Sequence, residues 1–164
     1  MRTDLIALSI AAAARPGISQ TAISSLQIIR ADHVLPRVHS VHRPSLCFIV
    51  QGAKEVSVGR AVFRYRSMEF LFSSVDLPMT GQVIEASSAK PYLCLVLEID
   101  PSLVFELTTA STSTGLAPAW VERAEQAIFV GKRDEQLGDA FLRLLLCAAS
   151  PLDAQVLAPS ECLG

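Results

Sequence analysis

Short apolar runs separated by turn residues dominate the chain between residues 44 and 99. Val, Ile, Phe, Leu and Tyr fill the runs, and the breaks between them fall at Gly52, Gly59, Pro78, Gly81, Ser87-Ser88 and Pro91. No helix of ordinary length fits between these breaks. Several short strands at this spacing are typical of an all-β sandwich or barrel. The pattern therefore predicts six strands in this region.

A two-residue turn at Gly59-Arg60 sets the register of one hairpin, because glycine supplies the positive φ of the first turn position. The pairs expected across this turn are Val58 with Ala61, Val56 with Phe63, Lys54 with Tyr65 and Glu55 with Arg64. Side chains alternate between the two faces of a strand, so Val56, Phe63 and the Tyr65 ring share an apolar face. Glu55 and Arg64 form an exposed ion pair on the other face. A sheet that closes over a core has these two kinds of face.

Two segments outside this region have helical patterns. Residues 3–14 predict a short amphipathic helix that ends at Pro16-Gly17; the alternative, a secretory signal, is disfavoured by Asp4 in its charged region. Residues 134–150 predict the strongest helix, with Asp134 as N-cap and Pro151 enforcing its end. A first strand is expected from Leu26 to Arg30.

Composition limits the function classes. The 164 residues are most economically one domain, and 51% hydrophobic against 18% charged residues leaves apolar area for a partner or for missing sequence to cover. The net charge of −2 and the lack of a Lys/Arg cluster argue against nucleic-acid binding by this chain alone. No apolar run approaches the ~20 residues of a membrane span. The four cysteines form no CxxC pair, which suits a reducing cytoplasm.

Several short segments resemble, in order and spacing, the N-terminal domain of AraC-type transcriptional regulators. They are Pro44-Ser45-Leu46-Cys47, Gln51-Gly52-Ala53-Lys54, Asp76-Leu77-Pro78, Gln82-Val83-Ile84, Pro91-Tyr92-Leu93 and Asp100-Pro101, and the likeness runs from Leu26 to Asp153. The resemblance implies a mainly β fold: a cupin-like double-stranded β-helix, or jelly-roll barrel, followed by a helical segment. We expect the chain to divide into an N-terminal helix and lead-in (1–25), a β-barrel sensor (26–100) and a helical dimerisation segment (101–164).

The resemblance also implies a function. We expect a regulatory domain that senses a small-molecule effector, mediates dimerisation, or does both. Such regulators continue into a pair of helix-turn-helix motifs that bind DNA, and we expect that segment to be missing from this chain. The alternative is a small cupin-type metal-dependent enzyme, an isomerase or a dioxygenase.

The spacing of the histidines counts against that alternative. All three, His33, His39 and His42, lie between residues 31 and 43. Cupin enzymes place two histidines two residues apart on one strand, whereas His39 and His42 are three apart and would face opposite sides. Solvated loop histidines are the favoured interpretation. No carboxylate in or near a strand has a catalytic partner at a telling spacing. We therefore expect no catalytic residue, no metal and no cofactor.

Two candidate sites remain. A barrel of this kind can enclose a ligand cavity lined by inward side chains, and the candidates for its wall are Phe48, Val56, Phe63 and Tyr65. The strongest helix carries more apolar side chains than one packing face requires. We expect one stripe to rest on the barrel and another to form a homodimer interface, built from Leu137, Phe141, Leu142, Leu144, Leu145 and Ala148. The alternative is a helix buried inside one domain.

Overall fold

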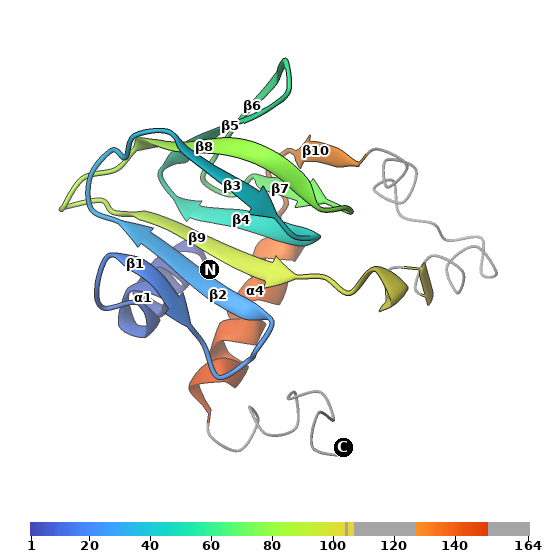
Figure 1. The fold of residues 1–164 in the computed structure, drawn as a ribbon. Coiled ribbons are helices and arrows are strands. Elements are labelled where there is room, and N and C mark those ends of the chain that lie inside the picture. Colours follow the sequence, from blue (N-terminus) through green and yellow to red (C-terminus); the bar gives the residue numbers. More distant parts are fainter. Residues whose placement is uncertain (104, 107–126, 151–164) are drawn as a thin grey trace.

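The structure is a computed structural model and describes residues 1–103, 105–106 and 127–150. Its strands form two antiparallel sheets (Figure 1). The six-stranded sheet has the order β1 (Gly17–Gln20), β2 (Leu26–Ala31), β9 (Tyr92–Glu98), β4 (Ser45–Gln51), β7 (Phe70–Ser73) and β10 (Ile128–Gly131). The four-stranded sheet has the order β3 (Val38–His42), β8 (Leu77–Glu85), β5 (Ala53–Val58) and β6 (Ala61–Arg66).

The six strands predicted between residues 44 and 99 are present as β4 to β9. The hairpin register is also confirmed: Val58 pairs with Ala61 and Val56 with Phe63, and Gly59 has a φ of 57°. The ion pair across this hairpin differs from the expected one in burial. Glu55 is buried, and its carboxylate accepts hydrogen bonds from Arg64 Nε at 2.6 Å and Arg37 at 3.4 Å.

Two strands were not predicted. The sequence predicts loop residues around the histidines, whereas residues 38–42 form β3, which pairs with β8 along its whole length. β1 pairs with β2 at the edge of the six-stranded sheet. Both lie at a sheet edge and most of their side chains are exposed, so neither has the apolar alternation that marks a half-buried strand. Main-chain pairing with a neighbouring strand holds them in the sheets.

Both helices cover the side of the six-stranded sheet that faces away from the four-stranded sheet (Figure 1). α1 (Arg2–Ala12) packs against α4 (Glu135–Ala149), close to the positions predicted for both. The Asp134 side chain accepts a hydrogen bond from Leu137 N at 2.9 Å, which confirms it as the N-cap of α4. The rest of the predicted helical segment 101–164, including Cys162, lies largely outside the described residues.

The protein therefore has two cores, one on each face of the six-stranded sheet. The first fills the space between the two sheets and includes Val56, Tyr65, Tyr92 and Cys94. The second lies between the six-stranded sheet and the helices. Its buried residues come from the first 25 residues, from the strands and from α4; they include Leu5, Ile23, Ile28, Phe48, Phe141 and Leu145. Described residues of all three predicted segments therefore meet in this core.

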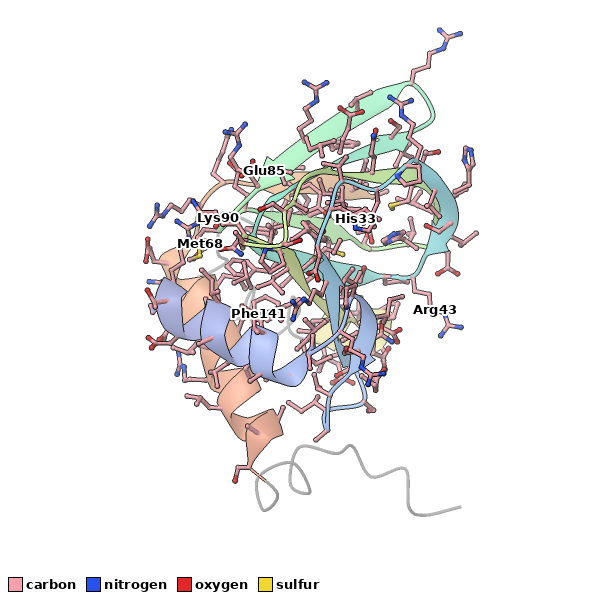
Figure 2. The ribbon with its side chains drawn as sticks, turned by 90° about the vertical axis from the view of Figure 1, so that its left-hand side faces the viewer. His33, Arg43, Met68, Glu85, Lys90 and Phe141 are labelled. Carbon is pink, nitrogen blue, oxygen red and sulfur yellow. The ribbon has the colours of Figure 1, made fainter. Side chains whose placement is uncertain are left out.

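The second core changes the interpretation of α4. Phe141, which is labelled in Figure 2, is fully buried. Its ring stacks on Phe48, with centroids 5.1 Å apart and planes at 20°. Leu145 is only 3% exposed. The expectation that these two residues belong to a dimer interface is wrong, because the sheet and α1 cover them within one chain. Leu137, Leu142, Leu144 and Ala148 are partly buried against the same core, whereas Leu146 is 51% exposed.

Candidate functional site

The space between the sheets contains three of the four side chains predicted to line a ligand site. Val56 and Tyr65 are buried there, and Phe63 packs against them. Phe48 lies on the opposite face of its strand, against the helices, and its predicted place in the barrel wall is wrong. β4 is covered on both faces, so its sequence has no apolar–polar alternation from which the inner face could be read.

Buried polar groups distinguish this space from an ordinary apolar core. The hydroxyls of Tyr65 and Tyr92 are fully buried; Tyr92 has the Cys94 thiol as a weak hydrogen-bond partner, and Tyr65 has no partner among the described residues. A buried hydroxyl without a partner costs about 1–3 kcal/mol, since it has lost its bonds to water. The Tyr65 hydroxyl is therefore a departure from the usual pairing of buried polar groups.

Lys54 shares the inner face of β5. It lies opposite Tyr65 on β6 and opposite Val83 on β8, and it is two residues from the fully buried Val56. Its side chain runs past Gly81: a Cβ built on this glycine would lie 3.0 Å from Lys54 Cε and 3.4 Å from Nζ. Gly81 thus leaves the room that the lysine occupies. The half-buried ammonium group forms no ion pair with any acid in the described ranges.

Burial and the neighbouring groups shift the pKa values in this space in both directions. Burial raises the pKa of the Tyr65 and Tyr92 hydroxyls well above their ordinary value, and the nearby thiols raise both further. A hydrogen bond with the Cys47 thiol, together with burial, raises the pKa of the Cys94 thiol. Lys54 acts electrostatically on both thiols. Hydrogen bonds with Cys94 and His42, together with the charge of Lys54, hold the pKa of the Cys47 thiol well below its ordinary value. The inner space therefore combines neutral hydroxyls and a Cys94 thiol of raised pKa with a Cys47 thiol of lowered pKa within electrostatic reach of Lys54.

The sequence contained part of this arrangement. The predicted hairpin register already placed Lys54 opposite Tyr65, but only the apolar members of that face were chosen as site residues. Tyr92 was not chosen, although alternation along β9 puts it on the same face as Cys94. Neither local pattern shows that Tyr92 and Tyr65, on different sheets, face the same space. That follows from the packing of the two sheets.

The histidines do not form a metal site in the described part of the chain. His39 and His42 have opposite orientations on β3, as predicted, and His39 Nδ1 is 2.9 Å from Thr80 Oγ1 at the surface. Across residues 1–103, 105–106 and 127–150, no group of three or more His, Cys, Asp or Glu side chains is arranged to hold a metal ion. No helix in these ranges is long and apolar enough to cross a membrane.

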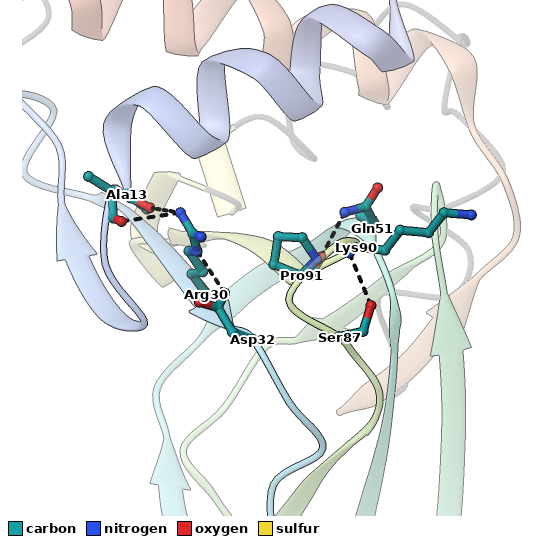
Figure 3. A network of polar contacts seen from close by, with 8 residues as sticks. Ala13, Arg30, Asp32, Gln51, Ser87, Lys90 and Pro91 are labelled. Atoms are coloured by element: carbon teal, nitrogen blue, oxygen red, sulfur yellow. Dashed lines mark hydrogen bonds and ion pairs between the residues drawn. The ribbon is translucent and has the colours of Figure 1, made fainter.

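A polar depression of about 410 Å³ lies at one end of the barrel, lined among others by Arg2, Arg66 and Lys90. Hydrogen bonds fix the backbone around this end (Figure 3). Gln51 Nε2 donates to the Pro91 carbonyl oxygen at 2.9 Å, and Lys90 N donates to Ser87 Oγ at 3.0 Å. The cations here are exposed, so this depression is a solvated rim, in contrast to the buried groups between the sheets.

Comparison with known proteins identifies the class. Residues 22–161 match the family model of the AraC-type transcriptional regulator N-terminus, and the chain belongs to this family. The predicted membership and the predicted fold class, a mainly β cupin-like barrel with a C-terminal helix, are both confirmed. The chain is thus a domain of a transcription regulator, a class that is not defined by catalysis. No curated protein matches the chain.

Two solved structures of ToxT from Vibrio cholerae share the fold. Apo ToxT from strain SCE256 is 4% identical, with a TM-score of 0.51 over 87% of this chain and 53% of ToxT. ToxT from strain O395, bound to (E)-4-(8-methylnaphthalen-1-yl)but-3-enoic acid, is 9% identical, with a TM-score of 0.50 over 81% of this chain and 52% of ToxT. The chain therefore spans about half the length of these regulators.

Proposed function

We propose that this chain is the sensing domain of a transcription regulator and binds a small-molecule effector between its two sheets. The observation that carries the proposal is the buried Tyr65 hydroxyl without a partner, next to Lys54 on the neighbouring strand, in a core that also contains Tyr92, Cys47 and Cys94. Unpaired polar groups do not stabilise a structural core. In a binding site they are useful, because a ligand supplies the missing hydrogen-bond partners and its binding energy depends on them.

The effector state reaches DNA through a segment of the regulator outside this chain. The six-stranded sheet connects the proposed effector site with α4, since the site lies on one face of this sheet and α4 lies on the other. Strand β4 contributes to both: Cys47 and Ile49 face the site, while Phe48 stacks on Phe141 of α4. A ligand that moves β4 by a fraction of an ångström thus moves the surface on which α4 rests.

Dimerisation is the second part of the proposal. The outer side of α4 carries the exposed Leu146 next to the half-buried Leu142. An isologous dimer brings the same patch of two chains together. This dimer interface contains fewer residues than the one predicted from the sequence, because Phe141 and Leu145 are already covered within the chain. A dimer formed in this way places two DNA-binding segments in one assembly.

Methyl-resolved NMR of the chain during a screen of small metabolites tests the effector site. We expect at least one compound to shift the signals of Val56 and Met79, which face the space between the sheets. Leu26 and Ile28 are equally buried but face the helices, and they serve as internal controls. Shifts confined to the helical side, or a screen without any binder, would contradict the proposal.

A further inference from the structure

Two cysteines lie together in the core between the two sheets. Cys47 on β4 and Cys94 on β9 are both buried there. Strand pairing sets Val96 of β9 opposite Cys47. Cys94 is two residues before Val96, so the two cysteines are diagonal neighbours on the same face of the sheet. Both thiols are free and lie within hydrogen-bonding reach of each other.

The two thiols differ in reactivity. The titratable groups that face Cys47 are Cys94 on β9, His42 on β3, Lys54 on β5 and Tyr65 on β6. The hydrogen bond with Cys94, followed by His42 and Lys54, lowers the pKa of Cys47 against the effect of burial. The pKa of Cys94 is raised. A thiolate is the attacking form of a cysteine, so Cys47 is the nucleophile and Cys94 is the second thiol beside it.

The end of β3 gives a small oxidant a route to Cys47. β3 is an edge strand of the four-stranded sheet and most of its side chains are exposed. His42, its last residue, is half-buried and its side chain forms a hydrogen bond with the Cys47 thiol. Segments with few buried contacts open locally at a low free energy. Hydrogen peroxide is little larger than water, so a local opening of β3 admits it.

We propose that Cys47 and Cys94 are a redox-modification site, at which hydrogen peroxide converts the two thiols into a disulfide. The Cys47 thiolate attacks the peroxide: an S–O bond forms, the O–O bond breaks, and the hydroxide that leaves takes up a proton to give water. The Cys94 sulfur then attacks the Cys47 sulfur: the S–S bond forms, the S–O bond breaks, and hydroxide leaves with the Cys94 proton as a second water. The two thiols supply the two electrons that reduce the peroxide. This reaction needs no effector, so it is tested independently of the proposed function.

The disulfide connects oxidation with α4. Diagonal neighbours on paired strands are about 7–8 Å apart, whereas the Cα atoms of a disulfide are usually about 4.4–6.8 Å apart, so forming the bond draws β4 and β9 together. Phe48 follows Cys47 on β4 and stacks on Phe141 of α4. We expect oxidation to shift the methyl NMR signals of Leu145, which packs in the same core as these two rings. Unchanged Leu145 signals in the oxidised chain would overturn this coupling.

Peptide mapping after oxidation of the folded chain tests the site itself. The double variant Cys147→Ser, Cys162→Ser keeps the proposed pair as its only thiols. Treatment with hydrogen peroxide, followed by alkylation of the remaining thiols in denaturant, should yield a disulfide between Cys47 and Cys94 within one chain. Dithiothreitol should restore both thiols. Thiols that stay reduced, links only between chains, or a link that forms only in urea would overturn the proposal.

Further variants test the roles of the individual groups. Cys94→Ala removes the second thiol, so a sulfenic acid should persist on Cys47 and react with dimedone. Lys54→Met should slow disulfide formation at pH 7 by about 2-fold or more and move its pH profile upward, because less Cys47 is in the thiolate form. Lys90→Met removes a cation from the exposed rim and should change neither the rate nor the profile. An unchanged rate and profile in Lys54→Met would overturn the electrostatic activation of Cys47.

Discussion

Leu145 and Leu146 are neighbours on α4 with opposite environments, and a carboxylate at each position separates packing within the chain from packing between chains. Leu145 is 3% exposed and Leu146 is 51% exposed. Burial of a leucine contributes about 1.5–3 kcal/mol, and an unpaired buried carboxylate costs several kcal/mol more. Leu145→Glu should therefore lower the free energy of unfolding by about 5 kcal/mol or more. That is comparable to the whole stability of many domains.

Leu146→Glu is expected to leave the fold intact. Half of this side chain is already in water, so its replacement removes about 1 kcal/mol at most. If the outer side of α4 is the dimer seam, two added carboxylates meet there and the dimer dissociates. Gln136→Glu adds the same charge at an exposed position of the same helix and serves as the control.

Circular dichroism melts and sedimentation velocity at tens of micromolar distinguish the outcomes. The expected results are an unfolded or strongly destabilised Leu145→Glu, a folded monomeric Leu146→Glu and a folded dimeric Gln136→Glu. A Leu145→Glu chain that melts like the wild type would refute the assignment of Leu145 to the core. A wild-type monomer would refute the dimer proposal, and so would a Leu146→Glu chain that remains dimeric.

Three further predictions concern the barrel. Burial raises the pKa of Tyr65 and Tyr92, so the folded chain keeps protons that the unfolded chain releases. The contribution of these tyrosines to the free energy of unfolding should be constant below about pH 10. Above it, this contribution should fall by about 1.4 kcal/mol per pH unit for each tyrosine. Urea unfolding of the double Tyr→Phe variant between about pH 9 and pH 11 should show a shallower loss, and an equal loss would contradict the burial argument. Gly52 has a φ of +90°, and a Cβ added to it would lie 2.5 Å from the Glu85 carbonyl oxygen. Gly52→Ala should therefore lower the free energy of unfolding by about 2 kcal/mol or more in the same assay. Gly59→Ala serves as the control and should lower it less, because there is open space around Gly59. Glu55→Gln keeps the shape of the side chain but removes its charge from the ion pair with Arg64. We expect the free energy of unfolding to fall by about 1 kcal/mol, and this loss to shrink with added salt. A loss that is independent of salt would exclude the ion pair as its cause.

Local chemistry in the sequence determined a large part of this fold. The Gly59-Arg60 turn requires a backbone that few residues other than glycine adopt, so it set the hairpin register before any contact was known. Asp134 and Pro151 bounded α4 for a similar reason, since a cap and a helix-breaking residue act within one turn. The order and spacing of short motifs was enough to identify the family.

The tertiary structure decided what periodicity leaves open. Where a strand is buried on both faces, as β4 is, every position is apolar and alternation no longer separates inside from outside; Phe48 was therefore assigned to the wrong face. The excess of apolar residues on α4 was attributed to a partner chain, but α1 and the sheet together cover Phe141 and Leu145. The meeting of Tyr65 with Tyr92 depends on two sheets packing face to face, and this proximity of distant strands leaves no pattern in either strand alone.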